Sequence, residues 1–217
     1  GSGKSTLARL LCALGTPDSG TIVVDGLKTS DKHHRKQLHG IIGFVMQHPE
    51  RQLFAETVFK DVAFGPENMG LSPQDINDCV THALELTGLQ NKVEVSPFEL
   101  SGGQQRLCAI AGVLAMQPSI LVLDEPTAVL TESEAEVLLK SIKALAEKGI
   151  AVIFISHRLH EVMEICDRVV VLRDGVSIQD TETEKTDIQA IAAAMVGRKV
   201  EGQTAERTVR QFDETIL

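Results

Sequence analysis

The stretch Ile120-Leu121-Val122-Leu123-Asp124-Glu125-Pro126-Thr127 decides which fold class the sequence predicts. Four apolar residues run directly into two adjacent carboxylates, and Pro126 lacks the backbone N–H that continued strand pairing needs. This pattern predicts a buried parallel strand that ends at a site. Ligands of open α/β sheets bind at the carboxyl ends of the strands, so Asp124 and Glu125 are the first candidate site residues.

The first six residues, Gly1-Ser2-Gly3-Lys4-Ser5-Thr6, supply a second element of a candidate site. They precede an amphipathic helix that we expect over about residues 4–14. Backbone N–H groups of such a loop can cradle phosphates, and the Lys4 ammonium can reach the terminal ones. The Ser5 hydroxyl can hold Mg²⁺ beside Asp124, which leaves Glu125 free to polarise a water molecule. Together the two stretches predict hydrolysis of a nucleoside triphosphate.

Length, composition and charge fit one globular domain. The chain has 217 residues, of which 43% are hydrophobic and only 3% aromatic, so we expect an aliphatic core. The net charge of −9 argues against a broad nucleic-acid or anionic-membrane surface. No apolar run is long enough to span a bilayer. Four cysteines without metal-ligand or redox spacing are interpreted as packing residues: Cys12, Cys79, Cys108 and Cys166.

Periodicity and turn residues predict the remaining elements. Strands are expected at 21–26, 41–47, 150–156 and 168–172, and helices at 72–87, 107–115, 132–148, 159–166 and 187–197. Residues 28–39 are basic and are interpreted as a solvated helix or loop. Residues 48–72 mix Pro, Gly and apolar residues, which favours a partner-binding surface over a second core. The polar tail 199–217 is expected to be loosely ordered.

Two polar residues follow predicted strands. Gln47 ends the run 41–47, where it is either a strand cap or a contact for Mg²⁺ and water. His157 follows the apolar run 150–156. A lone histidine is usually structural or merely exposed, but one at the end of a strand in register with the Asp-Glu strand is placed to reach a γ-phosphate.

The segment Leu100-Ser101-Gly102-Gly103-Gln104 precedes another predicted helix. Ser101 and Gln104 have capping-box spacing, and the two glycines leave the N–H groups of the helix start open to an anion. Ser-Gly-Gly is also a common turn, so the segment alone leaves both interpretations open.

In combination, these motifs resemble those of ATP-binding-cassette (ABC) ATPases from Gly1 to about Gly197. The motifs, in family order, are Gly1–Thr6, Gln47, Leu100–Gln104, Ile120–Glu125 and Ser156–His157. The resemblance implies an α/β fold of the P-loop NTPase (RecA-like) type, with a parallel sheet and an inserted helical subdomain at about residues 48–115. The ATPase domain would cover 1–198 and leave 199–217 as a polar tail.

The resemblance also implies ATP and Mg²⁺ as ligands and a role for each matching residue. Glu125 would be the general base, His157 would position the γ-phosphate, and Gln47 would sense it. Ser5, Gln47 and Asp124 would hold Mg²⁺. The nucleotide would be bound by Gly1, Ser2, Gly3, Lys4, Ser5 and Thr6 of one cassette and by Ser101, Gly102, Gly103 and Gln104 of a second cassette paired head to tail.

Within the family, the subtype signals conflict. Residues 48–54 and 61–68 resemble ATPases of energy-coupling-factor importers for vitamins or metal ions, whereas 127–134, 155–159 and 195–198 resemble those of sugar or nucleoside importers. We favour the first subtype because the family places its membrane-subunit contact in 47–68. The implied partners are a second cassette, identical or not, and transmembrane subunits, with this chain peripheral at the cytoplasmic face of the membrane and no nucleic-acid partner.

Two other classes of function compete with a transporter ATPase. A soluble cassette of DNA repair or translation control would carry a long coiled coil or a charged linker, and the sequence shows neither. A non-catalytic nucleotide-binding module tends to lose one of the two residues Glu125 and His157, and both are present.

The phosphate-loop pattern requires another glycine ahead of Gly1 and a strand before that glycine. We therefore expect that N-terminal strands are missing and that residues 1–217 by themselves fold poorly and bind ATP weakly. A cooperative thermal transition together with micromolar ATP affinity would contradict this expectation.

Overall fold

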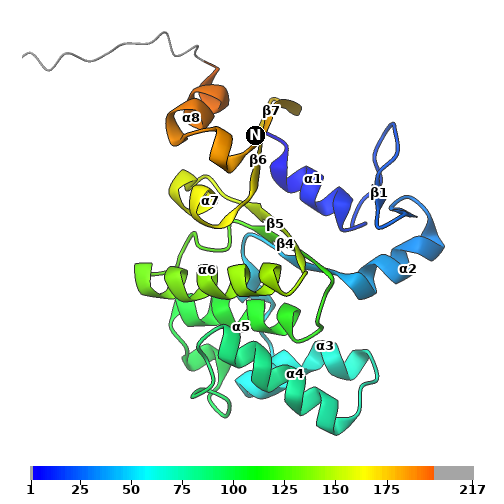
Figure 1. The fold of residues 1–217 in the computed structure, drawn as a ribbon. Coiled ribbons are helices and arrows are strands. Elements are labelled where there is room, and N and C mark those ends of the chain that lie inside the picture. Colours follow the sequence, from blue (N-terminus) through cyan, green and yellow to red (C-terminus); the bar gives the residue numbers. More distant parts are fainter. Residues whose placement is uncertain (1, 198–217) are drawn as a thin grey trace, which may run out of the picture.

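The structure is a computed structural model that describes residues 2–197. Gly1 of the expected phosphate loop and the tail 199–217 therefore lie outside the described residues. Within the described part, helices lie on both sides of a parallel sheet, and a two-stranded antiparallel ribbon lies beside it (Figure 1). No helix in this part is both long and apolar enough to cross a membrane.

The central sheet consists of β3 (Ile42–Val45), β4 (Ile120–Asp124) and β5 (Ala151–Ile155) in that order. Both pairs of strands are parallel, with Val45 opposite Leu123 and Leu123 opposite Phe154. This confirms a buried parallel strand at 120–124, with Asp124 as its last residue. Because the strands are parallel, their carboxyl ends lie at the same edge of the sheet.

Residues of β4 alternate between two cores, as the pleat of a strand requires. Leu121 and Leu123 pack into the larger of two cores, whereas Val122 packs on the opposite face. That opposite face is covered by α1 (Lys4–Leu11) and α2 (Lys32–Ile41). Figure 1 shows α1 on one side of the sheet and α5 on the other.

The larger core is built from four helices: α3 (Val58–Asn68), α4 (Pro73–Leu86), α5 (Gly102–Leu114) and α6 (Glu132–Glu147). The capping-box spacing of Ser101 and Gln104 is confirmed, because a capping box opens α5. The side chain of Ser72 caps α4, and a second capping box opens α6. Helix α5 begins five residues earlier than expected. The capping box at Ser101 draws both glycines of the segment into its first turn.

The expectation that residues 48–72 form a surface rather than a core was wrong in part. A 3₁₀ helix at Pro49–Gln52 (η1) and helix α3 occupy most of the segment. Val58 and Val62 of α3 are fully buried, while Phe54 and Phe64 are 59% and 49% exposed. The helical spacing of the buried residues was obscured in the sequence by the Gly and Pro residues that follow them.

The segments outside these two cores are shorter. A hairpin of β1 (Val23–Val24) and β2 (Leu27–Lys28) replaces the expected strand 21–26. The C-terminal part contains α7 (Leu159–Ile165), β6 (Arg168–Arg173), β7 (Val176–Glu182) and α8 (Ile188–Val196), with 3₁₀ turns at Pro97–Glu99 (η2) and Thr183–Lys185 (η3). The sequence did not predict β7, whose polar residues form a strand only through pairing with β6.

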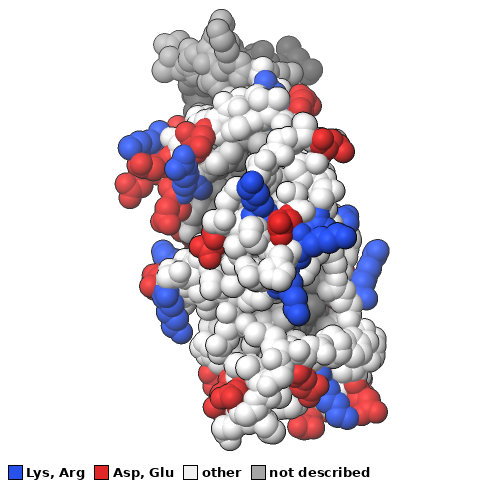
Figure 2. All heavy atoms as spheres, turned by 90° about the vertical axis from the view of Figure 1, so that its right-hand side faces the viewer, with Lys and Arg blue, Asp and Glu red and all other residues white. Residues whose placement is uncertain are grey.

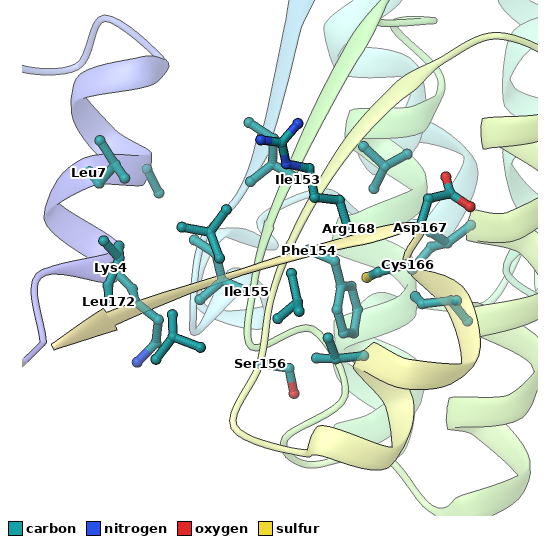
Figure 3. Close-up of a pocket in the computed structure, with 18 of the residues that line it drawn as sticks. Lys4, Leu7, Ile153, Phe154, Ile155, Ser156, Cys166, Asp167, Arg168 and Leu172 are labelled. Carbon is teal, nitrogen blue, oxygen red and sulfur yellow. The ribbon is translucent and has the colours of Figure 1, made fainter. Parts of the chain in front are cut away.

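An apolar groove of about 610 Å³ separates β5 from β6, and α1 lies along it. Figure 3 shows Lys4 and Leu7 of α1 on one side of the groove and Ile153 to Ser156 on the other. The strand expected at 150–156 is confirmed as β5, but the expectation that it is buried was wrong, because Ile153 is 37% exposed and Ala151 is exposed as well. Among the described residues β5 pairs with β4 alone, so its outer edge faces the groove.

Candidate active site at the end of the central sheet

The two carboxylates that follow β4 lie in different surroundings. Asp124 ends the strand and is only 4% exposed. Glu125 adopts a left-handed backbone conformation with φ 53°, and its N–H donates to the Ile155 carbonyl of β5 at 2.9 Å. Such a conformation is uncommon for a residue with a side chain and is found at functional sites when the surrounding structure holds it in place. It turns the Glu125 side chain away from the strand direction.

The Glu125 carboxylate is paired with His157. Oε2 of Glu125 lies 2.7 Å from Nδ1 of His157, which follows β5. The carboxylate is 15% exposed and the imidazole 64% exposed, so the pair lies at the surface of the sheet end. The expected register of the strand before His157 with the Asp-Glu strand is confirmed, since Asp124 lies opposite Ile155. The roles of Glu125 and His157 stay predictions.

The start of α1 has the shape expected of a phosphate loop. Gly3 has φ 87° and no side chain caps the helix, so no side chain occupies its first N–H groups. The Lys4 ammonium donates to the Ser2 hydroxyl at 2.8 Å, and the hydroxyl-bearing residues Ser5 and Thr6 are exposed. Lys4 also lines the groove together with Ser156. This places the lysine near the end of β5.

The remaining candidates lie on other elements. Gln47 is exposed just past the end of β3, the neighbour of β4. At the start of α5, the Ser101 side chain accepts from the Gln104 N–H at 3.2 Å, and the Gln104 side chain accepts from the Ser101 N–H. Ser101 and Gly102 are exposed at the start of α5. The structure brings Glu125 and His157, which follow different strands, into direct contact.

Sequence reasoning missed Arg106, which is completely buried behind the carboxylates. Its Nε donates to the Pro126 carbonyl at 2.7 Å and its Nη2 donates to the Glu125 carbonyl. Burial lowers the pKa of the Arg106 guanidinium, while the nearby carboxylate of Glu50 opposes this effect most strongly. An arginine at the start of an apolar helix looks like a surface residue, and no local pattern could have revealed these contacts.

A second buried polar contact holds the segment that follows β4. The Thr127 hydroxyl donates to the Glu161 carboxylate of α7 at 2.7 Å, and Arg158 donates to the other oxygen of the same carboxylate at 3.1 Å. The segment after β4 and the segment after β5 that carries His157 are thus both hydrogen-bonded to Glu161 of α7. This fixes the relative positions of the two segments that carry Glu125 and His157.

The residues near the phosphate loop suit an anionic ligand with Mg²⁺. Figure 2 shows Lys and Arg side chains gathered over the middle of the face that carries α1 and α2, despite the net charge of −9. The described residues contain no group of three or more His, Cys, Asp or Glu that could hold a metal by itself. A hydroxyl and one carboxylate nevertheless fit Mg²⁺, which often binds through one or two protein oxygens and substrate phosphates.

Comparisons with known proteins agree with this geometry. Residues 1–128 match the family model described as ABC transporter. The chain is 45% identical to the energy-coupling factor transporter ATP-binding protein EcfA2 of Caldanaerobacter subterraneus over 178 residues, which is 81% of the chain and 62% of that relative. It thus spans less than two thirds of the relative's length.

Solved structures show the same fold. The cbiO1 protein of Clostridium perfringens, part of the ABC transporter complex cbiONQ, matches with a TM-score of 0.78 and 34% identity over 90% of this chain and 77% of its own. The ATP-binding cassette MJ0796, a dimer bound to ADP and Pi, matches with a TM-score of 0.75 and 28% identity over 84% of this chain and 81% of its own. These matches confirm the expected P-loop NTPase fold class. The chain belongs to the ATP-binding cassettes of the ABC transporter family.

Proposed function

We propose that this protein is the ATP-hydrolysing subunit of an ABC importer of the energy-coupling-factor type. The observation that carries the proposal is the Glu125–His157 pair at 2.7 Å, located where the Asp124 strand ends. A carboxylate held by a histidine at the carboxyl end of a parallel strand is suited to accept a proton from an attacking water. The names of the relatives favour the energy-coupling-factor subtype over a sugar or nucleoside importer.

In this proposal the phosphate loop binds ATP. The N–H groups at the start of α1 face the phosphates, the loop being formed by Gly1, Ser2, Gly3, Lys4, Ser5 and Thr6. Release of the Lys4 ammonium from the Ser2 hydroxyl would let it contact the β- and γ-phosphates. Ser5, Asp124 and Gln47 would hold Mg²⁺, which when bound neutralises phosphate charge.

Hydrolysis then depends on the Glu125–His157 pair. One oxygen of Glu125 is held by His157, and the other accepts a proton from water as the water oxygen bonds to the γ-phosphorus. The bond from that phosphorus to the bridging oxygen of ADP breaks, which gives ADP and phosphate. His157, whose Nδ1 contacts Glu125, would direct its Nε2 at a γ-phosphate oxygen. Positioning and charge neutralisation supply most of the rate in this reaction class.

A second cassette would complete the site. Ser101 and Gly102 are exposed at the start of α5, followed by the buried Gly103 and the half-buried Gln104. In this proposal the four residues Ser101, Gly102, Gly103 and Gln104 bind the nucleotide of a partner cassette, whether identical or not. The dimeric structure of MJ0796 supports this arrangement by analogy. ATP held between two cassettes would make their closure depend on nucleotide.

Transmembrane subunits would dock beside η1 and α3. Phe54 and Phe64 are exposed there and contact each other edge to face at 4.9 Å between ring centroids, and Met69 is 49% exposed. Neighbouring exposed aromatic side chains are typical of an interface. We infer a peripheral location at the cytoplasmic face of the membrane and import of a vitamin or a metal ion as the coupled process.

The test measures Mg-ATP hydrolysis by the full-length protein and by its Glu125→Gln variant. Loss of the general base should lower kcat by about 100-fold to 10,000-fold. The variant should accumulate as an ATP-bound dimer in size-exclusion chromatography with light scattering. A variant that hydrolyses ATP as fast as the parent would refute the role of Glu125.

A further inference from the structure

Arg106 occupies a position that the proposed hydrolysis does not yet use. Its side chain is fully buried and comes from α5, yet its hydrogen bonds go to the two residues that follow Asp124. A guanidinium presents a rigid fork of N–H groups, so two carbonyls bound by one fork are fixed relative to each other. The Glu125 carbonyl is one of them.

The backbone that Arg106 binds is the strained part of the site. Glu125 has φ 53°, a conformation that is unfavourable for a residue with a side chain. The direction of the Glu125 side chain toward His157 depends on this conformation. A donor that holds the Glu125 and Pro126 carbonyls therefore stabilises the orientation of the carboxylate.

The remaining nitrogen of the Arg106 guanidinium, Nη1, faces η1. Nη1 of Arg106 lies 3.7 Å from Oε2 of Glu50, and within the described residues both of these buried atoms lack a hydrogen-bond partner. The distance is beyond hydrogen-bond range, and a shift of about 0.5–1 Å would bring it within range. The other Glu50 oxygen lies 3.2 Å from Nδ1 of His48. Glu50 therefore connects the buried arginine to the segment that precedes exposed Phe54.

We propose that Arg106 is a positioning residue for Glu125, and that Glu50 links this positioning to the Pro49–Gln52 segment. The proposal rests on the proposed function, because it assigns Arg106 to the same site. A displacement of η1 that closes the gap between Glu50 and Arg106 is transmitted through the fork to the Glu125 carbonyl. Through Glu50 and Arg106, the Pro49–Gln52 segment beside exposed Phe54 is thereby connected to the catalytic carboxylate.

Two substitutions separate the parts of this connection. Arg106→Lys keeps a positive charge but cannot serve both carbonyls and Glu50 with one ammonium. Glu50→Gln keeps the shape and the carbonyl contacts of Arg106 but removes the charge. Arg168→Lys is the matched control, because Arg168 also forms a two-pronged contact, with Asp180 at 2.6 and 2.8 Å on the exposed β6–β7 ribbon.

The first readout is the kinetics of ATP hydrolysis by the full-length protein. Arg106→Lys should lower kcat by about 10-fold or more with KM within about 3-fold, because it acts on orientation rather than on binding. Glu50→Gln should lower kcat about 3-fold, and adding it to Arg106→Lys should have no further effect. The control should keep the parent kcat. A rise in KM at unchanged kcat, or multiplicative effects of the two substitutions, would overturn the proposal.

The second readout needs no turnover and covers the case in which Arg106→Lys does not fold. The imidazole ¹⁵N signal of His157 reports its hydrogen bond to Glu125, and Glu125→Gln gives the signal of the altered pair. Arg106→Lys, or Glu50→Gln by itself, should move the His157 signal toward that reference. An unmoved signal contradicts the positioning role. If Glu125→Gln hydrolyses ATP like the parent while the His157 signal still responds to Arg106, the proposed function fails and the positioning role stands.

Discussion

The two parts of the candidate site are held in different ways: the carboxylates after β4 (the carboxylate side) and the phosphate loop before α1 (the phosphate-loop side). On the carboxylate side, β4 is paired along both edges, and Arg106 fixes the backbone beyond its end. On the phosphate-loop side, β5 is paired along one edge among the described residues, and α1 lies over a groove of about 610 Å³. The N–H of Gly175 donates to the Ser2 carbonyl at 3.3 Å and ties the loop to the β6–β7 turn.

This difference separates the described parts of the site that have a full set of neighbours from the part that does not. The carboxylates are held by strand neighbours on both edges of β4 and by buried hydrogen bonds. In residues 1–217 the phosphate loop precedes α1, which packs over the groove. We therefore expect changes around the groove to affect the phosphate loop of these residues more than the carboxylates.

Amide hydrogen exchange of residues 1–217 should show the largest effect. The Ala151 N–H and the Ile155 carbonyl bond toward β4, so the alternation of a parallel strand turns the N–H groups of Val152 and Phe154 toward the groove. We expect these two amides to exchange at least about 1000-fold faster than the Ile153 amide of the same strand. The Ile153 N–H points toward β4, so it exchanges only when the sheet opens. Protection of Val152 and Phe154 would show that the outer edge of β5 is paired in solution.

Paired alanine substitutions in the two strands should show a smaller difference. Leu123 of β4 is fully buried, whereas Ile153 of β5 is 37% exposed. Leu123→Ala should lower the free energy of unfolding by about 2–5 kcal/mol and Ile153→Ala by about 1 kcal/mol, because only the first leaves a cavity in a closed core. Urea denaturation with unchanged m-values measures both. Equal losses would mean that the groove is closed in solution.

Alkaline pH should lower the free energy of unfolding by similar amounts through the cores on the two faces of the sheet. Burial raises the pKa of the Cys12 thiol next to α1 to about 12, and that of Cys108 in α5 also to about 12, from an ordinary value of 9.0. The unfolded chain releases these protons first, so the stability is fully present below pH 9 and falls as pH rises toward 12 by about 1.4 kcal/mol per pH unit for each thiol.

The matched variants Cys12→Ala and Cys108→Ala test the pH prediction. Each should make the fall in unfolding free energy between pH 9 and pH 11 less steep than in the parent, by about the same amount. Denaturant titrations at a series of pH values measure the slopes. An unchanged slope for Cys12→Ala alone would mean that the phosphate-loop side admits water to its core and is looser than the structure shows.

Local signals in the sequence predicted the carboxylate side well. The apolar run before Asp124 predicted the strand, and the spacing of Ser101 and Gln104 predicted the capping box, although the helix was expected to begin only at residue 107. Each depends on residues within one turn or one strand. The register of the strand before His157 with the Asp-Glu strand was also predicted, whereas the direct contact of Glu125 with His157 was not.

Features that depend on distant partners could not be predicted in this way. Strand β7 exists through pairing with β6, and the exposure of Ile153 follows from which strands flank β5. Helix α3 was missed because Pro66 lies inside it and signals a break. The contacts of Arg106 join residues about twenty positions apart and leave no local pattern.

Gly103 has a consequence for exchanging segments between related cassettes. A Cβ at this position would meet the carboxylate of Glu134, the residue that closes the capping box of α6. A side chain at residue 103 would therefore require the Glu134 carboxylate to leave its place in the capping box of α6, and Arg106 binds the segment after the intervening strand. A chimera should keep residues 101–134 from one parent, so that residue 103, the segment after β4 and the cap of α6 stay matched.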